Sequence, residues 1–125
     1  MRKIEQTIVE LLRNGNDGNY NLSCRDNVQI QGIYKQYALW ENILFWNDSN
    51  GIFYFCGRGY PTQTTKSRLS VILTAFFDAF IYQKKSEWFL SWNNKEYLIN
   101  SFDIYYFKDN KVFRLDAHNT EVLPL

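Results

Sequence analysis

The chain passes from a predicted strand into a predicted helix through the segment Gly57-Arg58-Gly59-Tyr60-Pro61-Thr62-Gln63-Thr64-Thr65-Lys66-Ser67-Arg68-Leu69. Glycine and proline interrupt regular structure here, and three threonines then precede a run of apolar residues. The first turn of a helix leaves four backbone N–H groups without intrahelical partners, and the helix dipole adds partial positive charge. The segment therefore predicts a helix start, which is a place that favours an anion.

Two interpretations of this segment stay open. In the first, it holds phosphate, with charge-assisted donors on Arg58, Lys66 and Arg68 and neutral donors on the threonine hydroxyls. In the second, Thr64 or Thr65 is an ordinary helix N-cap surrounded by solvated basic residues, and Arg68 forms a salt bridge with Asp78 or bonds a carbonyl group.

The periodicity on either side predicts a single α+β domain. Residues 1–14 form an amphipathic helix, and residues 20–56 alternate as an antiparallel β-meander with a turn at residues 47–51. A second helix is expected over residues 65–83, and its apolar residues surround most of its circumference. Either the sheet and the later strands cover this helix on several sides, or it also forms a dimer face. Strands follow over residues 87–115, and residues 116–125 are expected to be an irregular tail.

Composition excludes several functions. The formal net charge is +1, which argues against broad binding to duplex DNA. The chain has one histidine, His118, and no metal-ligand spacing, glycine elbow or dinucleotide fingerprint. We therefore expect no catalytic residues, no metal and no cofactor. The amino terminus lacks a signal peptide and no segment is long enough to span a bilayer, so we expect an intracellular protein outside the membrane.

Three segments resemble a widespread group of small phage and prophage proteins. They are Val28-Gln29-Ile30-Gln31-Gly32, the corner Gly59-Tyr60-x-Thr62-x-Thr64-Thr65-Lys66-x-Arg68-Leu69, and the stretch from Trp88 through a hairpin to Phe107-Lys108-Asp109-Asn110. The resemblance covers roughly residues 28 to 114. Ser70 and Asn110 stand where that group usually has asparagine and glycine. The order of elements is also similar to that of phage anti-Thoeris proteins, which sequester signalling nucleotides of the cyclic ADP-ribose type without cleaving them.

The resemblance, together with the basic corner, implies a phage-encoded counter-defence protein in the host cytoplasm that binds a cyclic nucleotide signal. A homo-oligomer through the second helix is expected. One alternative is an inhibitor that docks directly on a host defence protein, such as a CRISPR nuclease, because tyrosine, tryptophan and arginine are common at interface hot spots. A second alternative is a single-stranded nucleic-acid-binding protein, whose binding would weaken steeply with salt.

The predicted ligand site has two parts. The phosphate part consists of Arg58, Thr62, Thr64, Thr65, Lys66 and Arg68. The part that holds the base or forms the rim consists of Tyr60, Trp88, Phe107 and Arg114. If this is correct, replacing Lys66 and Arg68 together with alanine abolishes binding and leaves the melting temperature nearly unchanged.

Overall fold

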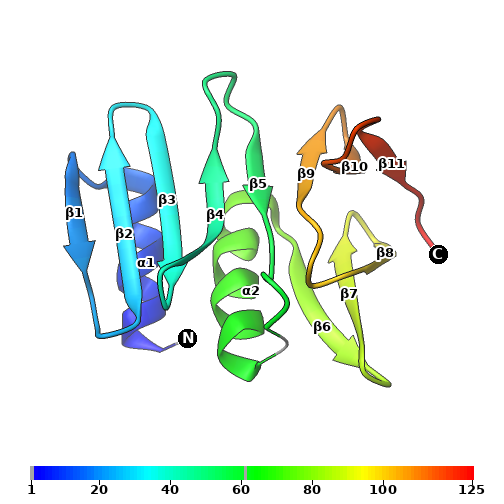
Figure 1. Ribbon diagram of the computed structural model, residues 1–125, viewed down its shortest axis with the longest axis horizontal. Helices are drawn as coiled ribbons and strands as arrows, with labels where there is room; N and C mark the ends of the chain where they lie inside the picture. The colour runs from blue at the N-terminus through cyan, green and yellow to red at the C-terminus, as the bar shows by residue number, and fades with distance from the viewer. Residues whose placement is uncertain (1, 61) are drawn as a thin grey trace.

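The computed structural model describes residues 2–60 and 62–125, so Met1 and the predicted breaker Pro61 lie outside the described residues. Helices and strands follow one another in the order drawn in Figure 1. The elements are α1 (Lys3–Asn14), β1 (Gly18–Asn21), β2 (Asp26–Gln31), β3 (Tyr34–Leu39), β4 (Asn42–Asn47), β5 (Phe53–Phe55), α2 (Gln63–Phe77), β6 (Phe80–Lys84), β7 (Glu87–Trp92), β8 (Lys95–Ile99), β9 (Tyr105–Lys108), β10 (Lys111–Arg114) and β11 (Thr120–Val122). The predicted α+β class, with an antiparallel meander, two helices and later hairpins, is confirmed.

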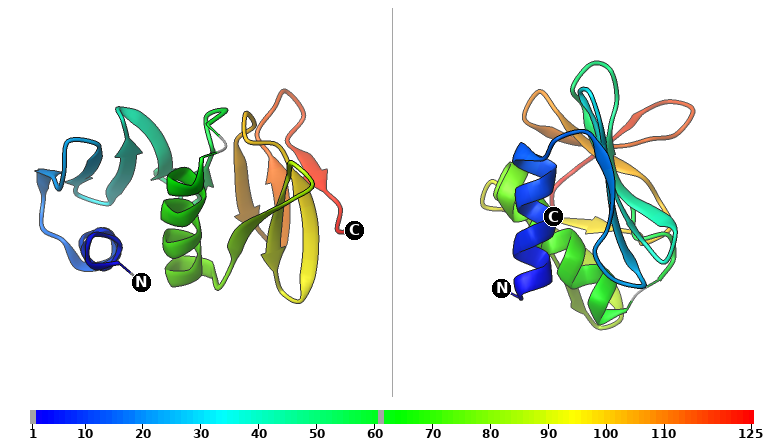
Figure 2. Two further views of the ribbon diagram at one scale, coloured as in Figure 1. Left: turned by 90° about the horizontal axis from the view of Figure 1, so that it is seen from below. Right: turned by 90° about the vertical axis from the view of Figure 1, so that its left-hand side faces the viewer.

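The described strands form two antiparallel sheets. The larger sheet has eight strands in the order β1-β2-β3-β4-β5-β9-β10-β11, and the smaller one has the order β6-β7-β8. Strand β9 pairs with β5 although α2 and the small sheet lie between them in sequence. Both helices lie on one face of the large sheet, and the small sheet lies beside α2 (Figures 1 and 2). No helix or strand of the described residues covers the opposite face of the large sheet (Figure 2), so most of its side chains meet solvent; Tyr106, which is 8% exposed, is an exception.

Aromatic side chains fill the covered face of the large sheet. Phe45 of β4 packs against Phe76 of α2, with ring centroids 5.3 Å apart. Phe107 of β9 contacts both Phe77 of α2 and Trp92 of β7, at 4.5 and 4.6 Å. One apolar core therefore continues from the helices into the small sheet.

Two predicted boundaries are wrong. The second helix was expected to reach residue 83, but α2 ends at Phe77, because Asp78 has a left-handed backbone (φ 57°) and caps the helix. The apolar residues that follow alternate as strand β6, which explains why they did not fit one helical stripe. The tail expected at residues 116–125 contains strand β11, which pairs with β10 through Val112 and Val122. An Asx-type cluster around Asp116 supports this turn, because its carboxylate accepts hydrogen bonds from the backbone of His118 and Thr120.

A buried ionic cluster ties α2 to α1 and to the sheet. Arg68 of α2 donates from Nε to Asp26 Oδ1 at 2.8 Å and from Nη1 to Glu5 Oε2 at 3.0 Å. The Tyr37 hydroxyl donates to Asp26 Oδ1, and the Ser67 hydroxyl donates to Glu5 Oε2 at 2.6 Å. Arg68 is 1% exposed, and both carboxylates are buried. Because each buried charge has an opposite partner and further hydrogen bonds, the cluster is compatible with the interior.

The electrostatics of this cluster follow from the same contacts. Burial alone would raise the pKa of Asp26, but hydrogen bonds from Arg68, Tyr37 and Ser23 outweigh it and lower the pKa below its usual value. Burial would likewise lower the pKa of Arg68, and the bond to Asp26 reverses that effect and raises it. All the charged forms are therefore favoured in the folded protein.

Candidate functional site

The solvent-facing side of the large sheet carries a continuous cross-strand row. In each pair of neighbouring strands, the register places one residue of this row directly opposite the next, so one residue of each strand lies in the row. In order across the sheet they are Asn19, Gln29, Gln36, Trp46, Tyr54, Tyr106, Phe113 and Glu121. We call these residues the outer row. Its first three members are amides, and its next four are aromatic.

The aromatic half of the outer row is stacked. Trp46 and Tyr54 have nearly parallel rings with centroids 5.7 Å apart, and Tyr106 and Phe113 are stacked at 5.3 Å. The Tyr54 hydroxyl donates to Asp48 Oδ2 at 2.8 Å. Burial and this bond raise the pKa of Tyr54 to about 12. The rings of the aromatic half therefore pack against one another, which holds each ring in a fixed orientation.

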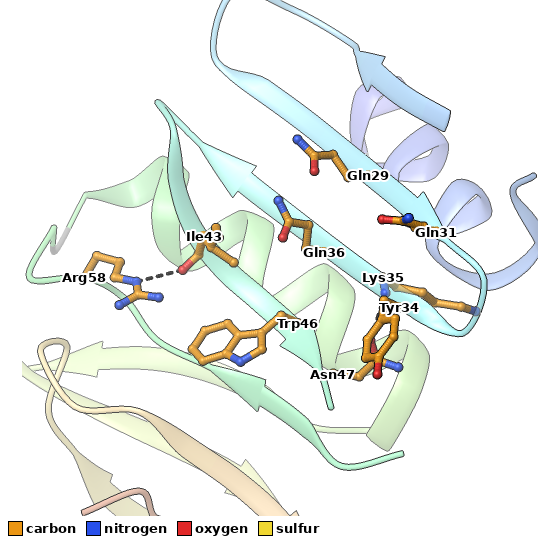
Figure 3. Close-up of a pocket in the computed structure, with 9 residues that line it drawn as sticks. All are labelled: Gln29, Gln31, Tyr34, Lys35, Gln36, Ile43, Trp46, Asn47 and Arg58. Atoms are coloured by element: carbon orange, nitrogen blue, oxygen red, sulfur yellow. Dashed lines mark hydrogen bonds between the residues drawn. The ribbon is translucent and has the colours of Figure 1, made fainter. Parts of the chain in front are cut away.

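A cavity of about 490 Å³ lies where the amide half meets the aromatic half (Figure 3). Its volume falls within the usual range of small-molecule sites, roughly 300–1,000 Å³. Figure 3 shows Arg58 and Tyr34 at opposite ends, with Gln36 and Trp46 between them. The full lining is Gln29, Gln31, Tyr34, Lys35, Gln36, Ile43, Trp46, Asn47 and Arg58.

Arg58 is held in place by three features of its surroundings. Its backbone adopts φ 55°, its Nε donates to the Ile43 carbonyl at 2.7 Å, and its guanidinium lies 5.1 Å from the centroid of the Trp46 ring. Its two terminal nitrogens have no hydrogen-bond or ion-pair partner within residues 2–60 and 62–125. A fixed guanidinium with free terminal N–H groups is suited to an anion, because little side-chain entropy is lost on binding.

Some of the other polar side chains of the cavity already form hydrogen bonds within the protein, and others form none. Asn47 accepts from Lys35 N and donates to the Ile33 carbonyl, both at 2.8 Å, and so pins the β2–β3 turn. The Lys35 ammonium donates to the Arg13 carbonyl at 3.3 Å, beside the end of α1. The side-chain amides of Gln29, Gln31 and Gln36 make no hydrogen bond to any described part of the chain, and each offers both a donor and an acceptor.

The structure separates the residues of the predicted phosphate corner. Arg58 lines the outer cavity, whereas Arg68 lies in the buried ionic cluster and is not accessible to a surface ligand. This corrects the expectation for Arg68: its helix position faces Asp26 and Glu5 rather than solvent, and Asp78 is not its partner. Lys66 donates to Gln83 Oε1.

The threonines cap the helix. The N-cap is Thr62 rather than Thr64 or Thr65, and its hydroxyl oxygen accepts from Thr65 N at 3.2 Å. Thr62, Thr64 and Thr65 line a separate cavity of about 400 Å³, together with Tyr60, Trp40 and Arg25. The threonine-rich motif therefore has a clear structural role, which is to start α2 and align Arg68 with its carboxylates.

The predicted base-binding residues also lie apart. Trp88 and Arg114 line a third cavity, at the junction of the two sheets. Phe107 is in the apolar core against Phe55, Phe77 and Trp92. None of the three lies beside the threonines.

Trp46, Tyr34 and the three glutamines were not predicted as site residues, although Gln29 and Gln31 belong to one of the segments that carry the family resemblance. The sequence does indicate that Gln29 and Gln31 face outward, because they alternate with Val28 and Ile30, which are buried in β2. The aromatic continuation across β9 and β10 depends on the pairing of β5 with β9, which is distant in sequence.

Two features limit the chemistry. Within the described residues, no three metal-binding side chains come together, and no helix is both long and apolar enough to cross a membrane. The outer cavity presents the fixed Arg58 guanidinium, side-chain amides and aromatic rings, together with Lys35 and the Tyr34 hydroxyl.

Comparison with known proteins identifies the class of protein: the sequence matches a model of a phage protein family over residues 1–114, which is almost the whole chain. The chain belongs to the Kyanoviridae Gp96 protein family. No curated protein and no solved structure was found to match it.

Proposed function

We propose that this phage protein binds a phosphate-bearing nucleotide in the outer cavity and sequesters it without cleaving it. The observation that carries the proposal is Arg58, which is fixed by Ile43 and Trp46 while its terminal nitrogens stay free at one end of a cavity of about 490 Å³. A phosphate group fits the two parallel donors of a guanidinium.

The rest of the cavity suits the base and sugar. Tyr34 is 49% exposed at the far end, and its ring is available for stacking on a base. Gln36 lies between Tyr34 and Arg58, and Gln29 lies beside Gln36 on the neighbouring strand (Figure 3); both amides can hydrogen-bond with a base edge or with sugar hydroxyls. Each side-chain amide can both donate and accept a hydrogen bond, so the cavity fits a neutral base attached to an anionic phosphate.

Because the chain belongs to a phage protein family, such binding would act against a host defence signal. A phage protein that holds an immune signalling nucleotide, of the cyclic ADP-ribose type, keeps the signal from host effectors. Sequestration requires tight binding and no chemistry, and the fixed Arg58 guanidinium and the free glutamine amides support such binding. A homo-oligomer through α2 stays a prediction.

The test is a calorimetric titration of the purified protein with cyclic ADP-ribose isomers, cyclic mononucleotides, ADP-ribose and inorganic phosphate. Arg58→Gln is expected to weaken binding about tenfold to a hundredfold, because a hydrogen bond to a charged group contributes roughly 1.5–3 kcal/mol. Arg13→Gln is the matched control, since Arg13 is an exposed arginine on α1. The bound nucleotide is then recovered by denaturation and checked by mass spectrometry.

Two results would overturn the proposal: no member of the panel binds, or a member binds equally well to the Arg58→Gln variant. Recovery of a cleaved nucleotide would replace sequestration by catalysis. Binding to oligonucleotides only, with steep salt dependence, would favour the single-stranded nucleic-acid alternative.

One observation favours docking on a host protein as a second candidate. Trp40 and Tyr60 are 59% and 52% exposed, and they line the cavity of about 400 Å³ with Arg25. Exposed tryptophan, tyrosine and arginine around an apolar hollow are typical of an interface hot spot. Trp40→Ala would then abolish inhibition of the host protein and leave nucleotide binding unchanged.

A further inference from the structure

The small sheet has one buried face and one exposed face. Its inward residues, among them Ile81, Leu90 and Tyr97, belong to the apolar core. Successive residues of a strand point to opposite faces of a sheet, so the residues between them form the outward face. Apolar side chains occupy the middle of that outward face as well.

Four apolar residues gather there. The strand register places Tyr82 of β6 opposite Phe89 of β7, and Phe89 opposite Leu98 of β8, so these three form one cross-strand row. The rings of Tyr82 and Phe89 are stacked, with centroids 5.3 Å apart, and the Phe80 ring lies 6.1 Å from Tyr82. We call Phe80, Tyr82, Phe89 and Leu98 the small-sheet patch.

The small-sheet patch is open to solvent. Phe80 and Leu98 are 47% and 44% exposed, and the other two side chains are half-buried. In the part of the chain that the structure describes, the patch rings make aromatic contacts only with one another. A single exposed apolar side chain is ordinary, but a contiguous group of them on a sheet face indicates an interaction surface.

The patch also explains part of the sequence pattern. The apolar residues that surround the expected second helix suggested a dimer face on that helix. Two of them, Phe80 and Tyr82, belong to β6 in the structure, so the apolar surface that they provide lies on the small sheet.

Charged side chains of opposite sign stand at two corners of the patch. Lys84 lies one outward position beyond Tyr82 along β6, and Glu96 lies one outward position from Leu98 along β8, toward the other end of the sheet. The Tyr82 hydroxyl donates to Glu96 Oε2 at 2.8 Å, which holds this carboxylate over the sheet. Neither Lys84 nor Glu96 has an ion-pair partner among residues 2–60 and 62–125.

This charge distribution fits a second copy of the same chain. In a two-fold symmetric dimer, every contact between two residues is accompanied by its reverse. A two-fold axis that lies in the interface, perpendicular to the line from Lys84 to Glu96, places Lys84 of each copy over Glu96 of the other. The strands of the two sheets then cross at a steep angle, as in orthogonal sheet packing. A nucleic acid or an anionic bilayer would instead be repelled by Glu96.

We propose that the chain forms a two-fold dimer through the small-sheet patch, in which Lys84 of each copy pairs with Glu96 of the other. Phe89, at the centre of the patch, packs against its own counterpart. Four apolar side chains make a smaller contact than a standard interface of about 20–30 residues a side, so the dimer is weak and depends on protein concentration. The dimer uses β6, β7 and β8 rather than α2, and it does not depend on nucleotide binding.

The first experiment is sedimentation velocity of the full chain over a range of concentrations. The wild-type chain is expected to pass from monomer to dimer as its concentration rises. Leu98→Lys is expected to leave only monomer, because it places a charge within the apolar contact. Leu115→Lys is the matched control, since Leu115 is 42% exposed and lies outside the patch, and it should dimerise like the wild-type chain.

The second experiment tests the charge pairing. Lys84→Glu and Glu96→Lys alone are each expected to weaken association at least about tenfold, because each brings like charges together at both corners of the dimer. An equal mixture of the two variants should associate about as well as the wild-type chain, because each reversed charge then meets an opposite charge. Recovery in the mixture also shows that both variants are folded, so this test decides the matter even if Leu98→Lys does not fold.

Three results would overturn the proposal. One is a wild-type chain that sediments as a monomer at every concentration. Another is a dimer that survives Leu98→Lys, which would favour a contact through α2. The third is a mixture of the two charge variants that associates no better than either variant alone.

Discussion

Replacing Arg68 with methionine is expected to lower the free energy of unfolding by about 3–5 kcal/mol, the usual cost of removing one partner from a buried ion pair. Methionine retains most of the apolar length of the side chain, so the loss reports on charge rather than on volume. Without the guanidinium, Glu5 stays buried with no cation paired to it among the described residues, and Asp26 stays buried with only the longer contact to Arg25, at 3.7 Å.

The magnitude follows from the contacts. Arg68 makes two hydrogen bonds to Asp26, at 2.8 and 3.4 Å, and one to Glu5 at 3.0 Å. The remaining hydrogen-bond partners, such as Tyr37 on Asp26 and Ser67 on Glu5, are neutral. Arg25 lies 3.7 Å from Asp26 Oδ2, but its side chain is partly exposed, so this ion pair offsets only part of one of the two charges. A domain of this size has a total stability of about 5–15 kcal/mol, so the substitution removes a large part of it.

The assay is equilibrium unfolding in urea, followed by tryptophan fluorescence. Lys66→Met is the matched control, because Lys66 lies two positions earlier on the same helix and bonds only to exposed Gln83; its expected effect is within about 0.5 kcal/mol. Adding Glu5→Gln and Asp26→Asn to Arg68→Met is expected to recover part of the loss, since both uncompensated charges are then removed. A loss below about 1 kcal/mol for Arg68→Met would refute the assignment of Arg68 to a buried ionic cluster. It would favour the sequence-based expectation that Lys66 and Arg68 can be replaced with little loss of stability.

Two further predictions test the same region. In acid, burial would raise the pKa of Glu5, but hydrogen bonds from Ser67, Arg2 N and Arg68 lower it, and the pKa of Asp26 is lowered as well. The stabilisation from both carboxylates is therefore complete above their unfolded-state pKa values, near 4, and it is lost as the pH falls through the lower folded-state values. Urea titrations at a series of pH values should show the free energy of unfolding decline over this range. In the Arg68→Met variant the decline should be smaller or reversed. Thr62→Ala is expected to destabilise the protein by about 1 kcal/mol through loss of the α2 cap, whereas Gln63→Ala should change stability by a few tenths, and equal losses would argue against the cap.

Local sequence patterns were sufficient for most of the fold. The first helix and the strands of the meander follow from residue periodicity, and the turn at residues 47–51 follows from its asparagine, aspartate and glycine content. The end of α2 was missed, because the apolar residues continue past Asp78 without a glycine or proline. Only a left-handed aspartate marks the change from helix to strand.

The sequence could not assign roles to the basic residues, because a role depends on the direction in which each side chain points. Arg58 and Arg68 are ten positions apart in the same motif, yet Arg58 lines the outer cavity and Arg68 pairs with Glu5 and Asp26 in the interior. Those carboxylates come from α1 and β2, and no local pattern connects them with α2.

The sequence by itself determined the class of fold, the helix start at the threonines and the presence of arginine and aromatic side chains suited to a ligand. These depend on interactions between residues close together in the chain. Only the tertiary structure decided which of these residues share a site, because the pairing of β5 with β9 and the packing of α2 over β2 bring together residues that are far apart in sequence. Those long-range contacts placed Arg68 in the core, aligned Trp46 with Tyr106 through Tyr54, and brought Trp88 and Arg114 to the lining of one cavity.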